Sequence, residues 1–337
     1  MKVLYVSDKS VLSRGIMNRL EKEDHDIYCL TNMHERKPML KRNYRNYNIN
    51  ELEDLQTIFS SVKPQIVIFE GFGYMNAEWS MEQKDYFSLL ACVLEESKNQ
   101  KVDMLIFLSS TEVYGDTAEY LQEDIELVPK TRRGMWLAQA ENMVQAYHKQ
   151  HRLTTAILRL SQVFGDEIDL NTKDYFAELA KLATEDMTII EEILQPIHVD
   201  DVADAVKRII DRRESVIYNV CSSFQIKKSK VLQFIGDLYG KRNSCTIESE
   251  ERQRVISNQR LKEEQEWVDF WKLEEQFHTD KIKINKKEKE KAVKIKKGKN
   301  YVVRYESFWK IWLYLPASLF YICLPVTIPY FRRLAGC

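Results

Sequence analysis

The chain has 337 residues, of which 44% are hydrophobic and 30% are charged, and its formal net charge at pH 7 is −1. These fractions are typical of a folded soluble protein, and the length allows a core domain of more than about 250 residues with an appendage. The charge is divided unevenly: residues 279–337 hold 14 Lys and Arg against 4 Asp and Glu, and the remainder holds 36 against 47. An acidic body without a recognised nucleic-acid-binding module argues against nucleic acid as a partner, and the basic tail suits another anionic surface.

Short apolar runs alternate with segments of helical spacing in the first half of the chain. The expected strands are Lys2–Val6, His25–Leu30, Gln65–Phe69, Met104–Leu108 and Thr155–Leu160. The expected helices are Val11–Glu23, Asn50–Val62, Asp85–Ser97 and Gly134–Gln150. This order predicts an α/β fold with a doubly wound parallel sheet and helices on both of its faces.

The pattern is more mixed after residue 165. Helices are expected at Tyr175–Thr184, Asp200–Asp211 and Lys228–Tyr239, with a short strand at Val216–Val220. These segments predict a smaller C-terminal α/β lobe over residues 166–278, interleaved with a first domain over residues 1–165. Because Lys2–Val6 already has the character of a strand, no signal peptide is expected before it.

The six cysteines show neither CxxC pairs nor a regular spacing. Cys29 and Cys92 lie in apolar runs and are expected in the core. We expect no metal site and no disulfide framework, which fits a reducing compartment.

The C-terminal part of the chain changes character twice. A lysine-rich stretch over residues 279–304 predicts a solvated basic linker, and residues 305–337 form a hydrophobic tail that contains the uncharged segment Ile311–Phe331. The tail residues suited to a membrane interface are Trp309, Trp312, Tyr314, Tyr321, Tyr330, Arg332 and Arg333. We therefore expect residues 281–333 to meet an anionic lipid surface.

The tail is expected to lie at the cytoplasmic face of a membrane, as a peripheral or re-entrant anchor. Pro316, Pro325 and Pro329 argue against a straight spanning helix, and basic residues on both flanks place both ends on one side. A re-entrant or in-plane anchor is therefore favoured over a single span. Two alternatives stay open: the lysine run is an ordinary solvated linker or a nucleic-acid contact, or the apolar segment docks on a partner or on a second copy.

Six segments, in order, carry a family resemblance. They are MKVLYVSDKSVLSRGIMNRL, LIFLSSTEVYGD, ILRLSQVFGD, IHVDDVADAV, IYNVCSS and SNQRLKEEQEWVDFWKLEEQF. Together they resemble the NAD-dependent epimerase/dehydratase family, the extended short-chain dehydrogenases/reductases that act on nucleotide sugars. The resemblance spans residues 1 to about 278 and implies a Rossmann-like first domain followed by a smaller substrate-type lobe.

The family implies NAD(P) as cofactor, held by a Gly-x-x-Gly-x-x-Gly loop after the first strand. Ser7, Ser10 and Ser13 stand at the matching positions, each with a Cβ where a dinucleotide site needs glycine and where a positive φ becomes costly. Thr31 stands where the family places the acidic residue that holds the adenosine ribose. We therefore expect ordinary dinucleotide binding to be lost, with Ser10 serving as the N-cap of the following helix.

The family also implies a Tyr-x-x-x-Lys pair on the helix that contains RGMWLAQAENMV. Aligned on the glycine and the glutamate of the family motif, Arg133 stands at the tyrosine position and Leu137 at the lysine position. A shift by two residues offers Met135 and Gln139 instead. None of these is a proton-transfer group of suitable pKa, since arginine stays charged and leucine has no polar atom.

One catalytic position of the family is retained at Ser110, which matches the residue that hydrogen-bonds the reacting hydroxyl. Thr111 and Glu112 follow where related dehydratases place an acid and a base, and only Glu112 keeps a carboxylate. A lone serine is more often a strand-end residue than a nucleophile. His198 and Asp200–Asp201 are expected to pack a loop and cap the next helix. The sequence holds no other catalytic motif and no metal-ligand pattern.

The residues and the resemblance together predict a non-catalytic relative, or pseudoenzyme, that binds no cofactor. It is expected to act as a membrane-associated scaffold, partner-binding or ligand-sensing protein in nucleotide-sugar or glycan metabolism. Its partner is expected to be a protein or a second copy, since family members pair through the helices that Asp85–Ser97 and Gly134–Gln150 resemble. Two alternatives stay open: a divergent, active NAD(P)-dependent nucleotide-sugar epimerase, dehydratase or reductase, and a nucleotide-sugar binder without redox chemistry.

Overall fold

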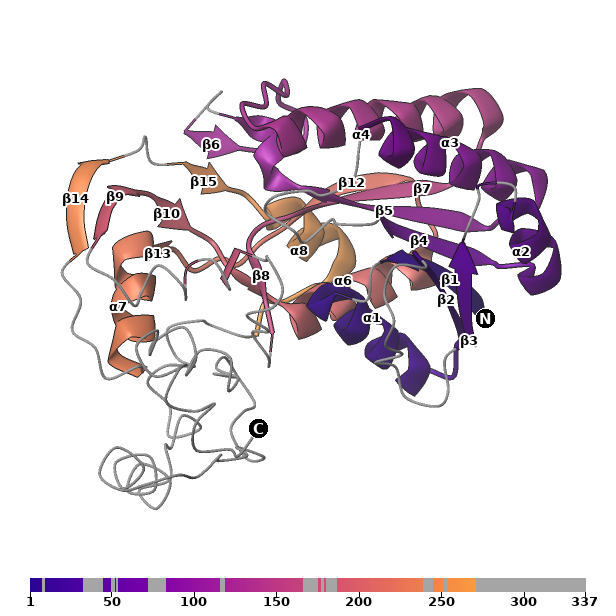
Figure 1. The fold of residues 1–337 in the computed structure, drawn as a ribbon, viewed down its shortest axis with the longest axis horizontal. Helices are drawn as coiled ribbons and strands as arrows, with labels where there is room; N and C mark the ends of the chain where they lie inside the picture. Colours follow the sequence, from indigo (N-terminus) through magenta and orange to yellow (C-terminus); the bar gives the residue numbers. More distant parts are fainter. Residues whose placement is uncertain are drawn as a thin grey trace, which may run out of the picture.

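A central parallel sheet with helices on both faces makes up most of the molecule, and a smaller region of short strands lies beside one end of it (Figure 1). The structure, a computed structural model, describes residues 1–7, 10–32, 45–49, 52, 54–71, 83–115, 119–165, 175–176, 179, 187–238, 245–250 and 254–270. The basic linker and the hydrophobic tail lie outside the described residues, as does most of the helix expected at Tyr175–Thr184.

The main sheet has seven strands in the order β12-β7-β5-β4-β1-β2-β3. Their bounds are β1 (Lys2–Ser7), β2 (Asp26–Asn32), β3 (Arg45–Ile49), β4 (Ile66–Gly71), β5 (Met104–Ser110), β7 (Thr155–Leu160) and β12 (Val216–Val220). Each pair of neighbours runs parallel. The strand order reverses between β1 and β4, so the doubly wound, Rossmann-like sheet expected from the sequence is confirmed.

Burial on both faces explains the composition of the central strands. Every residue of β4 and of β5 is buried, which is why these strands are continuous apolar runs rather than alternating patterns. The edge strand β3 has the polar sequence RNYNI, and so the apolar pattern does not predict it.

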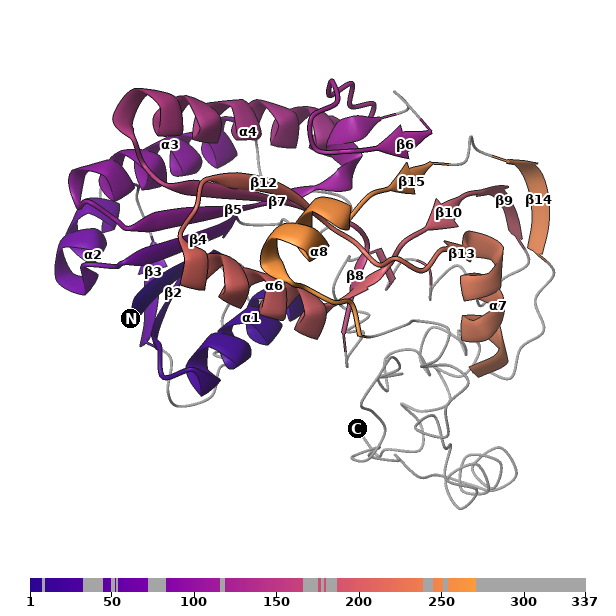
Figure 2. The same ribbon diagram turned by 180° about the vertical axis from the view of Figure 1, so that it is seen from behind.

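Helices form a layer on each side of the sheet (Figures 1 and 2). One layer consists of α2 (Asp54–Val62), α3 (Gln83–Asn99) and α4 (Arg132–His151), and the other of α1 (Val11–Lys22), α6 (Val199–Arg212) and α8 (Gln259–Gln265). The expectation that the second helix begins at Asn50 is wrong, because the residues just before it belong to β3 and the helix starts only at Asp54.

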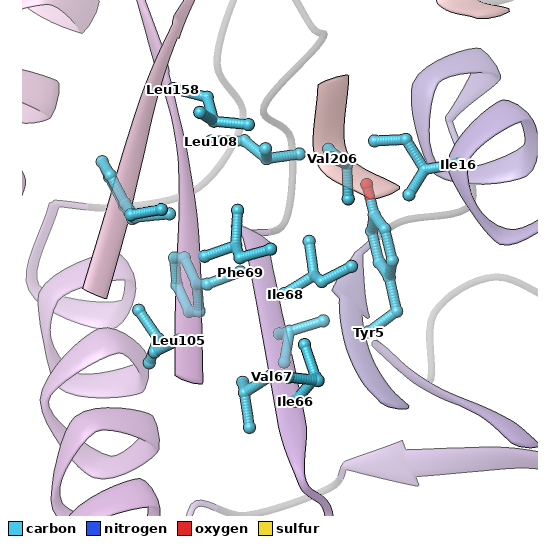
Figure 3. Close-up of a cluster of buried hydrophobic side chains, with 14 of the residues drawn as sticks. Tyr5, Ile16, Ile66, Val67, Ile68, Phe69, Leu105, Leu108, Leu158 and Val206 are labelled. Atoms are coloured by element: carbon cyan, nitrogen blue, oxygen red, sulfur yellow. The ribbon is translucent and has the colours of Figure 1, made fainter. Parts of the chain in front are cut away.

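Capping residues mark the starts of α1 and α6, as the sequence predicts. The Ser10 Oγ accepts a hydrogen bond from the Ser13 N–H at 3.0 Å. At α6 the cap is His198, whose Nδ1 accepts from the Asp200 N–H at 3.2 Å. In the core between these helices and the sheet, Ile16 of α1 and Val206 of α6 lie close to the ring of Tyr5 of β1 (Figure 3).

The smaller C-terminal region is built from short strand pairs. Parallel pairs are β9 (Met187–Glu191) with β14 (Cys245–Glu250), β8 (Val163–Phe164) with β11 (Ile197–His198) and β6 (Tyr120–Leu121) with β15 (Val255–Ile256), while β10 (Ile193–Leu194) runs antiparallel to β13 (Ile226–Lys227). The helix α7 (Lys228–Leu238) lies beside them (Figure 2). In the part of the chain that the structure describes, no helix combines the length and the hydropathy needed to cross a membrane.

Candidate functional site

Ligands of doubly wound sheets bind outside the carboxyl ends of the strands, where the strand order reverses. In this chain that point lies between β1 and β4, which end at Ser7 and Gly71. The neighbouring strand β5 ends at Ser110 and leads directly into the short 3-10 helix η1 (Thr111–Tyr114). The positions singled out in the sequence therefore lie along one edge of the sheet.

The serines at the glycine positions are integrated into the start of α1. Ser7 and Ser13 are fully buried. Ser10 is extended, with φ −65° and ψ 171°, and its carbonyl oxygen accepts a hydrogen bond from the Ser13 hydroxyl at 3.0 Å. None of the three serines is among the described residues with positive φ, the backbone conformation for which glycine is favoured. Serine therefore pays no positive-φ cost at these three positions.

A β-bulge lies where β1 and β4 approach their carboxyl ends. Val6 pairs with Phe69, but the next residue of β1, Ser7, pairs with Gly71, so Glu70 is the extra residue of β4. Successive side chains of a strand point to opposite faces of the sheet. Phe69 packs against Tyr86 of α3, so Glu70 lies on the face of α1, at the point where the strand order reverses.

Glu70 binds two hydroxyl groups from different elements. Its Oε2 accepts a hydrogen bond from the Tyr5 hydroxyl at 2.9 Å, and its Oε1 accepts one from the Ser10 hydroxyl at 2.5 Å. The side chain is only 1% exposed. No family motif predicts this group; its one local signal in the sequence is a carboxylate in the apolar run IVIFEG, just before a glycine. The carboxylate joins β1, β4 and the N-cap of α1.

Thr31, at the family's ribose position, lies near the end of β2 and is 1% exposed. It pairs in register with Asn48 of β3. A buried hydroxyl at this point cannot replace a carboxylate that accepts from two ribose hydroxyls.

Ser110 ends β5 and caps η1. Its Oγ accepts a hydrogen bond from the Glu112 N–H at 3.2 Å, and the residue is 6% exposed. Among the residues that the structure describes, no acceptor takes the proton of this hydroxyl. Ser110 is therefore a strand-end cap, as expected, that can still donate one hydrogen bond to a ligand.

Glu112 ties η1 to the first turn of α4. Its Oε1 accepts from Nη1 of Arg133 at 3.0 Å, and its Oε2 accepts from Oγ1 of Thr131 at 2.8 Å. Thr131 is the N-cap of α4, because its Oγ1 accepts from the Gly134 N–H at 2.9 Å. A Cβ on Gly134 would lie 2.6 Å from the carbonyl oxygen of Glu112. Only glycine lets α4 begin this close to η1.

Leu137 follows Arg133 one turn later on α4 and is fully buried. The shifted alignment is disfavoured, because Met135 is 52% exposed and Gln139 also faces solvent on the outer side of the helix. Of the two inward-facing positions that match the family's tyrosine and lysine, the first thus holds Arg133, which is paired with a carboxylate. The second holds Leu137, which is apolar.

A buried polar network joins several of the segments that carry the family resemblance. The Ser109 hydroxyl donates to Oε1 of Glu141 at 2.5 Å, and Oε2 of Glu141 pairs with Nη2 of Arg159 at 2.8 Å. Nη1 of Arg159 donates to the Tyr114 hydroxyl at 2.9 Å, and that hydroxyl donates to Oδ1 of Asn219 at 2.6 Å. Burial raises the pKa of Tyr114 to about 12, so the phenol keeps its proton. The network fastens β5, η1, α4, β7 and β12 together.

His198 and Asp201 have packing roles, as expected. The His198 ring is buried edge-on against Phe164, with ring centroids 5.0 Å apart. An Oδ1 of Asp201, which is 2% exposed, accepts from the Phe270 N–H at 3.2 Å. In the described ranges, no group of three or more His, Cys, Asp or Glu side chains is arranged to hold a metal ion.

None of the four cysteines among the described residues is disulfide-bonded. Cys29 is fully buried in β2, as predicted, whereas Cys92 of α3 is only half-buried against the core. Burial raises the pKa of the Cys221 thiol well above its ordinary value, which leaves it unreactive.

Residues 11–221 match the family described as the NAD dependent epimerase/dehydratase family. This match covers more than half of the chain. The chain belongs to this family.

The chain is also similar to a curated relative and to two solved structures. The dTDP-D-glucose 4,6-dehydratase of Dictyostelium discoideum is 27% identical over 257 residues, which cover 69% of this chain but only 57% of that protein. UDP-glucose 4-epimerase from Thermotoga maritima, solved with UDP-glucose, matches with a TM-score of 0.73 at 18% identity over 87% of this chain and 100% of its own. dTDP-glucose 4,6-dehydratase from Bacillus anthracis, solved with NAD, matches with a TM-score of 0.68 at 17% identity over 82% and 94%. At these identities the structures show a shared fold.

NAD(P) is the cofactor that the family implies, and the N-terminus of the first helix is where such folds bind the phosphates. In this chain the Ser10 hydroxyl already accepts from the Ser13 N–H and donates to the Glu70 carboxylate. Side chains fill space that glycines leave open, and a buried carboxylate opposes a phosphate at the same place. The residues present do not fit an ordinary dinucleotide.

Proposed function

We propose that the protein binds a nucleotide sugar at the carboxyl edge of its sheet and lacks the proton relay of its family. The ligand class is supported by the family membership and by relatives named for dTDP-D-glucose and UDP-glucose. The proposal that the proton relay is missing is supported by the ion pair between Arg133 and Glu112, with the buried Leu137 one turn later on α4.

The chemistry of these groups argues against the usual proton transfer. A guanidinium does not release its proton at physiological pH, so Arg133 cannot act as an acid or a base. Glu112 accepts hydrogen bonds on both carboxylate oxygens, from Arg133 and Thr131. Leu137 has no polar atom with which to hold a ribose hydroxyl. Without a group poised near neutral pH, this part of the site can bind but has no relay.

A second candidate is a divergent, active nucleotide-sugar epimerase, dehydratase or reductase. It is favoured by the relatives, which are named as enzymes, and by Ser110, whose hydroxyl can still donate to a ligand. Such an enzyme needs NAD(P) held without the loop glycines and a proton acceptor other than Arg133. Both candidates bind a nucleotide sugar, but only the second converts it to a product.

The role that we propose for a binding protein of this kind is ligand sensing or partner binding at a membrane. The support is the charge distribution, with an acidic body and basic residues 281–333 beside an uncharged segment. On this proposal the tail lies at the cytoplasmic face as a peripheral or re-entrant anchor, and a protein partner or a second copy completes the assembly.

Calorimetric titration with UDP-glucose and with dTDP-glucose tests the binding proposal. The wild type should bind at least one of the two, and Ser110→Ala should weaken that binding by about 2- to 10-fold, the value of one neutral hydrogen bond. Ser60→Ala, an exposed serine on α2, is the matched control and should bind like the wild type. If neither sugar nucleotide binds at millimolar concentration, the proposal is wrong.

A further inference from the structure

The amino end of α1 has an unusual electrostatic partner. The first turn of α1 contains no acidic side chain. Helix N-termini carry a partial positive charge and favour a nearby anion. Here the anion comes from another element, because Ser10, the N-cap, donates its hydroxyl proton to Glu70 of β4 while accepting from the Ser13 N–H. The cap hydroxyl thus couples the helix end to a carboxylate.

The fold holds this carboxylate in place. Oε1 of Glu70 accepts from Ser10 at the amino end of α1, and the buried Tyr5 hydroxyl binds the other carboxylate oxygen. Tyr5 is itself fully enclosed, with Ile16 and Val206 around its ring (Figure 3). At 1% exposure, Glu70 is not a surface side chain that swings aside for a ligand.

We propose that Glu70 is an internal anion that occupies the phosphate-binding end of α1 and so determines which ligands the site does not bind. It excludes a dinucleotide, whose pyrophosphate would bring a second negative charge to the same helix end. The ligand class left at the reversal between β1 and β4 is one that presents no phosphate to α1. This inference rests on Tyr5, Ser10 and Glu70, and it stands whether or not a nucleotide sugar binds elsewhere on the edge.

Two effects oppose a phosphate here. The negative charges of the Glu70 carboxylate and of a phosphate repel each other strongly when they are held close together. The helix N–H of Ser13 is also already satisfied by the Ser10 hydroxyl, so a phosphate must displace an existing bond. Neutralising Glu70 removes the first effect and leaves the shape of the side chain almost unchanged.

Titration of the full-length chain with inorganic pyrophosphate and with NAD⁺ tests the proposal. The wild type should bind neither at millimolar concentration. Glu70→Gln has almost the same shape but no charge; its amide oxygen accepts from one of the two hydroxyls, and its NH2 group donates to the other. This variant should bind pyrophosphate at least about tenfold more tightly than the wild type. Thermal unfolding of each variant shows whether it is folded.

Two variants separate charge from other effects. Glu70→Asp keeps the charge and should bind as weakly as the wild type. Ser60→Ala removes a hydroxyl from the exposed surface of α2, and it should also leave binding unchanged. Micromolar binding of NAD⁺ by the wild type overturns the proposal even if Glu70→Gln fails to fold. The proposal is also overturned if the Glu70→Gln variant is folded and binds pyrophosphate no more tightly than the wild type. A separate titration with UDP-glucose reports on the nucleotide-sugar proposal independently.

Discussion

At the scale of single residues, retained and replaced family positions have different surroundings. The retained Ser109, Tyr114, Glu141 and Arg159 bond to one another in a buried network that connects strands and a helix. The replaced position at Arg133 lies at the carboxyl edge, 20% exposed. The network residues therefore hold the fold together, whereas Arg133 lies where a ligand could reach it.

This contrast predicts very different costs for breaking two ion pairs. Glu141→Gln leaves the buried Arg159 guanidinium without its counter-charge and should lower the free energy of unfolding by about 3–5 kcal/mol. Arg133→Gln breaks a partly exposed pair with Glu112 and should cost less than about 1 kcal/mol. Urea unfolding at neutral pH measures both, and equal costs would contradict the structural role of the network.

Tyr114 gives the network a pH dependence at the alkaline end. Burial raises its folded-state pKa from 10.0 to about 12, which favours the protonated phenol. Its contribution to stability is therefore complete below pH 10 and is lost as the pH rises through about 12. Tyr114→Phe should make the fall in stability across this window shallower by about 1.4 kcal/mol per pH unit. Urea unfolding at several alkaline pH values checks this, and parallel curves for the two proteins would contradict it.

Part of the site could be predicted from sequence and part could not. The motif spacing locates Arg133 and Leu137 on the inward side of α4 because a helix repeats its faces regularly. Glu70 carries no such signal, since its partners Tyr5 and Ser10 are 65 and 60 positions away along the chain. Contacts between residues this far apart depend on how the strands pair, which no local pattern reveals.

At the scale of elements, α1 and α6 pack closely because position 15 has no side chain. A Cβ on Gly15 would lie 2.3 Å from Cγ2 of Val199, so Gly15→Ala should destabilise the fold by about 1–3 kcal/mol despite alanine's better helix propensity. Val199→Ala in the same chain removes the clash, so the double variant should be more stable than the two single changes added together. Thermal unfolding of the three variants measures this coupling. A Gly15→Ala protein more stable than wild type would show that the helices are not in such close contact.

The predictability of the elements follows their burial. Strands β1, β4, β5 and β7 were expected because their apolar runs are buried on both faces. The edge strand β3 and the two-residue strands of the C-terminal region have too few buried residues to form a pattern. The start of α2 was misplaced for the same reason, since β3 takes the residues before it.

At the scale of the whole molecule, the basic tail, unlike the acidic body, has the charge to bind an anionic lipid surface. Full-length protein should float with vesicles that contain anionic lipid, and a chain truncated after residue 278 should not. Raised salt should weaken the binding, because charges near the surface are screened, and neutral vesicles serve as the control. If the full-length and the truncated chain both stay soluble with anionic vesicles, the anchor proposal is wrong.

We propose that a nucleotide sugar binds at the carboxyl edge of the sheet and is not converted there. It is tested most directly by incubating the full-length protein with NAD⁺ and either UDP-glucose or dTDP-glucose and recording the sugar signals by NMR. We expect the signals of the bound sugar nucleotide to broaden while its chemical structure stays unchanged, because Arg133 and Leu137 cannot transfer a proton. The appearance of an epimerised or 4-keto sugar that depends on the protein would contradict the account.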